Sequence, residues 1–238
     1  MQARTISQDS YQAADFRGQT PICVYNAVSM ENVGLREEIA NSISHGLGLV
    51  LAIVAVPILV AAALRGGNVR FVVGVSVFGG TLVLLYLAST LYHSLTHETA
   101  KALCRVFDHT AIFLLIAGTY TPFSLGVLRG PWGWSLLAII WTLAIVGITL
   151  KIRKRTRHSR ITIVLYVIMG WLAIVAVKPM VMLIPVPGIL LIFAGGIAYT
   201  GGLAFFALER IRYNHFIWHL FVIAGTTCHF FAVLWYAS

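Results

Sequence analysis

The segment YNHFIWHLF, residues 213–221, carries His215 and His219 four residues apart at the start of an apolar run. Side chains four residues apart lie on one face of a helix, one turn from each other. Two imidazole rings placed in this way can hold a metal ion between them, and imidazole suits zinc, copper, nickel and iron. Two histidines at a membrane interface would show the same spacing, so the pair alone leaves both interpretations open.

A third histidine and a single acid strengthen the metal interpretation. His93 ends another apolar run, four residues after Ser89, and Asp108 opens the next run as the only aspartate beyond residue 15. Three imidazoles with an open fourth position are the ligand set of a catalytic zinc site. We therefore predict a zinc site with three histidine ligands, namely His93, His215 and His219. Asp108 would orient a water molecule, and Ser89 would hydrogen-bond in the same pocket.

A further motif precedes the first apolar run. Glu38, Asn41 and His45 form the pattern E-x-x-N-x-x-x-H on a short amphipathic approach. We expect these three residues to support the same centre. His229 lies ten residues beyond His219, and we expect it to hydrogen-bond within the core.

The elements that position these residues follow from the composition. The chain has 238 residues, of which 59% are hydrophobic and only 11% are charged. Soluble domains contain about 25% charged residues, and a spanning helix needs about 20 apolar residues. We therefore predict an all-α, polytopic membrane protein with a seven-transmembrane helix bundle. The predicted spans are 46–64, 71–92, 108–128, 132–150, 161–177, 188–208 and 214–236.

Two segments and the three cysteines lead to further expectations. Residues 1–36 are polar and lack an apolar signal-peptide core, so we expect a loosely ordered tail before one membrane domain at 37–238. The segment KPMVMLIPVPG, residues 178–188, is broken by three prolines, and we predict an interfacial loop there. Cys23, Cys104 and Cys228 show no paired spacing, so we expect no disulfide framework.

The basic residues predict the orientation. Thirteen of the 17 lysines and arginines lie in the N-terminal segment and in the loops that follow the even-numbered spans. The positive-inside rule then places the N-terminus in the cytoplasm. We interpret the net charge of +9 as topology and lipid contact, with no nucleic acid as partner. The basic run at 151–160 would contact anionic lipid through Lys151, Arg153, Lys154, Arg155, Arg157 and Arg160.

The order of the spans, which we call helix parity, predicts on which side of the membrane each candidate residue lies. In an alternating bundle, the starts of odd-numbered spans and the ends of even-numbered spans share one membrane side. His45, His93, Asp108, His215 and His219 all lie at such positions. We therefore expect them at one, cytoplasmic, side of the bundle.

These residues lie in motifs that resemble a known family. The segments EEIANSISHG, ASTLYHSLTH, FDHTAIFLLIAGTYTPF and RYNHFIWHLFVIAGTTCHF are similar to those of bacterial hemolysin III-like proteins, in the progestin and adipoQ receptor superfamily. The resemblance runs from about residue 37 to the C-terminus. It implies a seven-helix bundle in the bacterial inner membrane, with zinc bound by the three histidines and Asp108 contacting zinc-bound water. Ser89 would line that site, and Glu38, Asn41 and His45 would form the first motif.

Three functions remain open at this point. The first is a zinc-dependent hydrolase of lipid amides, similar to a ceramidase, acting in membrane lipid homeostasis. The second is a non-enzymatic regulator of membrane fluidity, or a receptor, in which zinc is structural. The third is a haemolysin or pore-former, against which the expected lack of a signal peptide and the continuous apolar spans argue. Members of the resembled family are linked to all three, so the resemblance predicts the site better than the activity.

Overall fold

The computed structural model describes residues 21–154, 160–208 and 210–238. The chain separates into two compact units, Met1–Arg36 and Glu37–Ser238, and the second unit holds the bundle. Within the described residues the regular structure is helical, without strands. The elements are α1 (Pro21–Arg65), α2 (Val69–Ser94), α3 (Glu98–Leu125), α4 (Pro131–Lys154), α5 (Arg160–Trp171), the 3-10 helix η2 (Leu172–Ala176), α6 (Val177–Leu183), α7 (Val186–Ala207) and α8 (Asn214–Tyr236).

Seven segments of the described chain are long and apolar enough to cross a bilayer. Six are the apolar lengths of α1, α2, α3, α4, α7 and α8, and the remaining one, Ile161–Leu183, joins α5, η2 and α6. Large apolar side chains such as Val50, Ile53 and Ile145 are exposed on the helix surfaces, as expected for positions that face lipid. The prediction of an all-α, seven-span membrane protein is confirmed.

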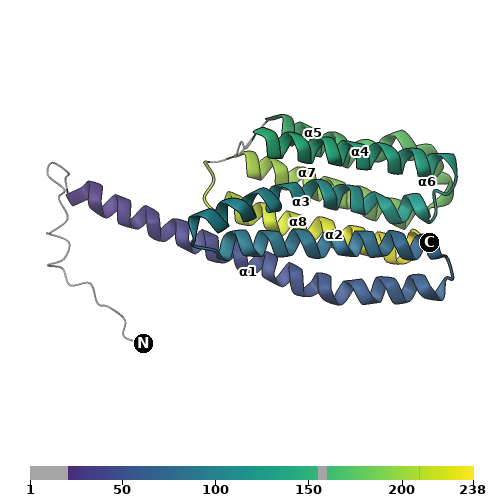
Figure 1. Ribbon diagram of the computed structural model, residues 1–238, viewed down its shortest axis with the longest axis horizontal. Coiled ribbons are helices and arrows are strands. Elements are labelled where there is room, and N and C mark those ends of the chain that lie inside the picture. The colour runs from purple at the N-terminus through teal and green to yellow at the C-terminus, as the bar shows by residue number, and fades with distance from the viewer. Residues whose placement is uncertain (1–20, 155–159, 209) are drawn as a thin grey trace. The chain divides into compact units, whose positions relative to one another are not determined.

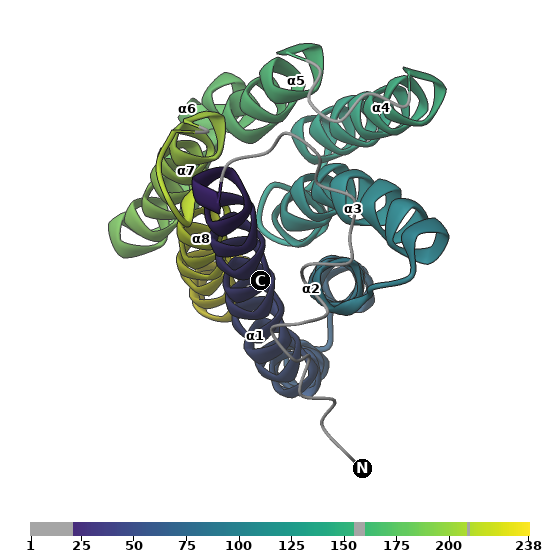
Figure 2. The ribbon, with the colours of Figure 1, turned by 90° about the vertical axis from the view of Figure 1, so that its left-hand side faces the viewer.

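Helices that follow one another in sequence pack side by side, notably α2 with α3, α3 with α4, and α7 with α8 (Figure 1). Helix α3 also contacts α5 and α8, which places it centrally among them. In the end-on view α8 lies between α7 and the bundle part of α1 (Figure 2). A hydrogen bond between Ser44 of α1 and His219 of α8 joins these two helices. The first and last spans therefore meet, although they lie far apart in sequence.

Helix α2 approaches α3 closely at one glycine. A Cβ atom added at Gly74 would lie 2.7 Å from the Cα of Pro122, which is backbone and cannot move aside. Small residues at such crossings let helices approach each other in a membrane, where packing is a main source of helix association. This contact anchors the part of α3 that follows the functional residues.

The third span begins earlier than predicted. Helix α3 starts at Glu98, with the His97 side chain accepting a hydrogen bond from the amide of Ala100 as its N-cap. The prediction that Asp108 opens the helix was therefore wrong, because Asp108 lies about three turns inside it. The first turns of α3 are charged and polar, so a search for apolar runs does not detect them.

The predicted loop at 178–188 was also wrong in its first part. Residues Val177–Leu183 form helix α6, and the break occurs at Ile184, before α7 begins at Val186. Pro179 is tolerated because it is the third residue of α6, where the amide has no partner within the helix. Pro185 is the N-cap of α7, and Pro187 is its second residue, where the amide likewise has no partner within the helix. The prolines start helices here and do not prevent them.

Two segments that we expected at the membrane surface, the N-terminal segment and the basic run at 151–160, differ from that expectation in part. Helix α1 begins at Pro21, so the stretch from Pro21 to the bundle is helical, and residues 1–20 lie outside the described residues. Lys151, expected to contact lipid headgroups, is only 7% exposed, with Arg105 and Asp108 as its charged neighbours. It is turned into the bundle, in contrast to the exposed Arg153. The positions 155–159 lie outside the described residues, and the side chains of Lys154 and Arg160 are not described.

Candidate metal centre

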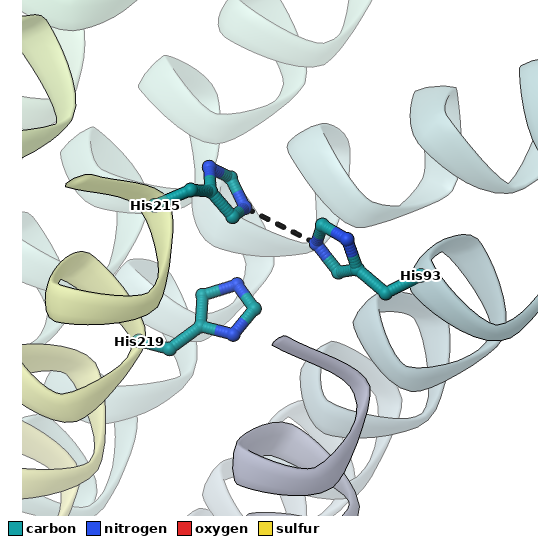
Figure 3. Close-up of side chains that lie close together, drawn as sticks. All are labelled: His93, His215 and His219. Carbon is teal, nitrogen blue, oxygen red and sulfur yellow. Dashed lines mark hydrogen bonds between the residues drawn. The ribbon is translucent and has the colours of Figure 1, made fainter. Parts of the chain in front are cut away.

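Three histidines meet at one end of the bundle, and we call His93, His215 and His219 the histidine triad. His93 ends α2, while His215 and His219 stand one turn apart at the start of α8 (Figure 3). One nitrogen from each ring lies within 4.8 Å of the others. The rings face one another from two helices, as the spacing and the helix parity predicted.

The distances within the triad suit a metal ion. The Nε2 atoms of His93 and His215 are 3.1 Å apart. Two ligand nitrogens of a tetrahedral zinc site with Zn–N bonds of about 2.0–2.1 Å are separated by about 3.4 Å. Two imidazole nitrogens this close must share either a hydrogen atom or a cation. A small shift of the rings would satisfy the metal geometry.

Hydrogen bonds orient two of the three rings. The Nδ1–H of His93 donates to the carboxylate of Glu38, at 2.9 Å. The Nδ1–H of His219 donates to the main-chain carbonyl of Asn41 at 3.2 Å, and to the Ser44 hydroxyl at 3.0 Å. In both rings Nδ1 is therefore the protonated nitrogen, which leaves the lone pair on Nε2. Metal-binding histidines are typically held in this way, with the second ring nitrogen donating to a carboxylate or carbonyl oxygen.

All of these orienting groups come from the first turns of α1 inside the bundle. Glu38 also forms an ion pair with Lys101 of α3, with 3.2 Å between Oε2 and Nζ. Ser44 donates to the Asn41 carbonyl, so the acceptors of His219 are themselves held in place. Glu38 and Asn41 had been predicted from the E-x-x-N-x-x-x-H pattern to support the centre, although Asn41 acts through its backbone carbonyl. Ser44 and Lys101 were missed, because no motif links either residue to the histidines.

His45 lies beside the triad but outside its cluster of ligand atoms. Its ring stacks on that of His219, with centroids 3.5 Å apart and an angle of 9° between the planes. The edge of Tyr86 contacts it from α2, with centroids 5.1 Å apart. His45 is only 3% exposed, and neither of its ring nitrogens has a hydrogen-bond partner among the described residues. The stacked His45 ring therefore restricts the position of the His219 ring.

The predicted acid and hydroxyl lie close to the triad. Asp108 is buried on α3, and Ser89 is buried on α2 one turn before His93. His93 and Lys151 lie close enough to the Asp108 carboxyl group to act on it electrostatically. The structure thus brings together every residue predicted for the centre, from α1, α2, α3 and α8.

Two histidines of the triad, His215 and His219, line one end of a cavity with a volume of about 150 Å³. His215, His219 and Asp108 contribute to its wall at this end. The remaining wall is mostly apolar and is formed mainly by α3, α5, η2, α7 and α8, with single residues from α2, α4 and α6. Among the apolar wall residues are Leu115, Phe123, Leu136, Met180, Phe193 and Val222. A polar end that contains two histidines of the triad thus adjoins an apolar space inside the membrane domain.

Comparison with known proteins agrees with this architecture. A family model described as "Haemolysin-III related" matches residues 33–230. The chain is 51% identical over 202 residues to Hemolysin-3 of Bacillus cereus, covering 85% of this chain and 92% of that protein. It is 45% identical over 202 residues to the Hemolysin-3 homolog of Bacillus subtilis (strain 168), covering 85% and 95%. It is also 26% identical over 167 residues to the monocyte to macrophage differentiation factor of Homo sapiens, covering 66% and 67%.

Proposed function

The chain belongs to the haemolysin-III-related family, and on that premise we propose that its histidine triad binds zinc and serves the hydrolysis of lipid amides. The observation that carries the proposal is the convergence of three imidazoles at the end of an apolar cavity whose wall also contains Asp108. A hydrolytic centre for a lipid needs both parts, a polar reaction site and room for a chain. Ceramide-like amides are the substrate class that fits them.

The donor set supports zinc. Three neutral imidazoles, two of them with their lone pairs directed by hydrogen bonds, form the three-ligand site that leaves one position open. When bound there, zinc supplies Lewis-acid chemistry, activating water and polarising a carbonyl. Glu38 and Asn41 keep the rings of His93 and His219 in the orientation that this chemistry requires.

Asp108 is the group of this chain that can move protons at the centre. In the proposed reaction, a water oxygen bonds to the amide carbon while the Asp108 carboxylate takes up the proton of that water. The carbon–nitrogen bond then breaks, and the carboxyl group returns the proton to the leaving nitrogen, so that a fatty acid and an amine are released. Ser89, buried one turn before His93, would supply a hydroxyl group to the same pocket. The apolar wall of the cavity would hold the acyl chain and exclude water from it.

Hydrolysis by purified protein tests this proposal. The full chain in detergent micelles, supplied with zinc, should release fatty acid from a ceramide, as measured by mass spectrometry. Asp108→Asn should abolish the release and still bind zinc, because Asp108 is not one of the clustered ligands. Glu98→Gln, on the exposed start of the same helix, is the matched control and should remain active. Zinc-loaded protein that releases no fatty acid from any lipid amide would overturn the hydrolase proposal.

A specific observation also favours a structural role for zinc. The triad joins α2 to α8, and the groups that orient it tie α1 to both helices. A metal ion at this point would clamp α2 to α8, which lie far apart in sequence. The second candidate function is therefore a regulator of membrane properties, or a receptor, without hydrolysis. In that case Asp108→Asn should preserve any cellular phenotype, whereas loss of the triad should abolish it.

The proposal also covers the location of the protein in the cell and its orientation in the membrane. The chain is a multi-pass membrane protein, and its similarity to bacterial proteins supports a location in the inner membrane. The distribution of basic residues supports a cytoplasmic N-terminus, with the triad at the cytoplasmic end. Arg153, exposed at the end of α4, is placed to contact anionic headgroups.

A further inference from the structure

A second pair of polar side chains lies on the cavity wall, away from the histidine triad. Tyr199 of α7 and His229 of α8 both line the cavity, and their ring centroids are 5.4 Å apart. His229 is only 8% exposed. The hydroxyl of Tyr199 and the Nδ1 atom of His229 are buried, and neither has a hydrogen-bond partner among the described residues. Buried polar groups are normally paired, so this pair calls for a partner that the chain itself does not supply.

The tautomer of His229 indicates what kind of partner is needed. Its Nε2 lies 3.1 Å from the carbonyl oxygen of Ile192, which can only accept a hydrogen bond. Nε2 therefore carries the hydrogen, and Nδ1 is left as an acceptor. The partner must donate to Nδ1 and can accept from the Tyr199 hydroxyl. A hydroxyl group does both, whereas a carbonyl group can only accept.

The other hydroxyl groups on the cavity wall already have partners within the protein. Each of them donates to a main-chain carbonyl: Thr119 to Leu115, Tyr120 to Met169 and Gly170, Tyr166 to His109, and Thr200 to Gly196. Tyr199 and His229 thus differ from the rest of the wall. Beyond the end formed by the triad and His45, they are the wall residues that carry a buried polar atom with no hydrogen-bond partner in the described structure.

Two glycines give the pair its position. A Cβ atom at Gly195 of α7 would lie 2.4 Å from Nε2 of His229, and one at Gly225 of α8 would lie 2.9 Å from the ring of Tyr199. Each ring therefore lies directly against the backbone of the opposite helix. This close fit restricts the rings to the place where both reach the cavity wall.

We propose that Tyr199 and His229 bind a hydroxyl group carried partway along the apolar chain of the ligand. His229 follows His219 by ten residues on α8, which corresponds to roughly 15 Å along the helix. A chain whose head group lies at the triad would therefore meet the pair well away from that head group. The inference rests on the proposed function in one respect, namely that the cavity holds a lipid chain. It adds that the protein prefers chains with a hydroxyl group at that depth.

Direct binding of fatty acids tests the proposal without requiring hydrolysis. The probes are fatty acids of one length, either unsubstituted or with a single hydroxyl group at successive positions along the chain. Binding to the full-length protein in detergent micelles is measured by native mass spectrometry, with and without zinc. We expect a hydroxyl group near the middle of the chain to strengthen binding about tenfold. A keto group at the same position should give less than half of that gain, because it cannot donate to Nδ1.

Variants identify the residues responsible. Tyr199→Phe removes only the hydroxyl, and His229→Leu removes the acceptor. Each variant should reduce the preference for the hydroxylated chain to less than threefold, with little change for the unsubstituted chain. Tyr213→Phe, outside the cavity wall, is the matched control and should keep the full preference. If His229→Leu does not fold, Tyr199→Phe still decides the question.

The outcomes separate this inference from the proposed function. Equal binding of hydroxylated and unsubstituted chains would mean that water alone satisfies the pair, and would overturn the inference while the chain-binding cavity stands. A preference that persists in Tyr199→Phe and His229→Leu, or that peaks next to the carboxyl group, would overturn it as well. Failure of every fatty acid to bind would overturn both the inference and the lipid-binding role of the cavity.

Discussion

Replacement of Glu38 by glutamine tests how the triad is oriented. Glutamine keeps the size of the side chain but removes the negative charge that accepts the hydrogen bond of His93 Nδ1. Loss of a group that orients a metal-binding histidine costs about 10–100-fold in metal affinity. The Glu38 side chain is 35% exposed, so solvent screens its charge, and we expect the lower end of that range. A tenfold loss corresponds to about 1.4 kcal/mol of binding free energy.

Competition between the purified protein and a fluorescent zinc chelator measures this affinity directly. Glu37→Gln is the matched control, since the neighbouring carboxylate shows no ion pair in the described structure. Glu37→Gln should bind zinc like the unchanged protein, whereas Glu38→Gln should bind about tenfold more weakly. If the two variants bind zinc equally well, the proposed role of the Glu38–His93 hydrogen bond is wrong.

Three further predictions follow from the packing and the centre. Asp108→Asn should abolish ceramide hydrolysis and leave the zinc content unchanged, as measured by fatty-acid release and by elemental analysis. Gly74→Ala should destabilise the protein by about 1–3 kcal/mol, because its Cβ would meet the backbone of Pro122; Gly80→Ala, where nothing lies within 4 Å, should leave the unfolding temperature unchanged or slightly raised. Removal of metal with a chelator should lower the unfolding temperature by several degrees, since a ligand bound only to the native state stabilises it. A chelator without effect on the unfolding temperature would argue against zinc as a clamp between helices.

Much of the histidine triad could be predicted from the sequence because its residues stand at helix ends with regular spacing. His215 and His219 are one turn apart, and His93 ends a span on the same side of an alternating bundle. These relations depend only on helix periodicity and on the number of spans. Asp108 was expected on that side as well, although it lies about three turns inside α3 and not at its start.

The contacts that complete the centre could not be predicted in this way. The hydrogen bonds of Ser44 and of the Asn41 carbonyl to His219 depend on how α1 is rotated against α8, which periodicity does not determine. The ion pair between Lys101 and Glu38 required the early start of α3, a polar stretch that hydropathy does not reveal. The burial of Lys151 also depends on helix rotation, since Arg153, in the same basic run, is exposed.

His229 shows the same limit. From the sequence we expected a hydrogen bond within the core, and its Nε2 does contact the Ile192 carbonyl. The sequence could not predict the state of the second ring nitrogen, Nδ1. It lacks a hydrogen-bond partner in the described structure because the side chains around it on the cavity wall do not provide one.

Elemental analysis of the purified protein is the most direct test of the central claim, that the histidine triad binds zinc. We predict one zinc ion per chain after purification without added chelator. For a correctly folded His215→Ala variant we predict less than a tenth of that amount. Metal-free protein that also fails to take up added zinc, or equal zinc contents in the two proteins, would contradict it.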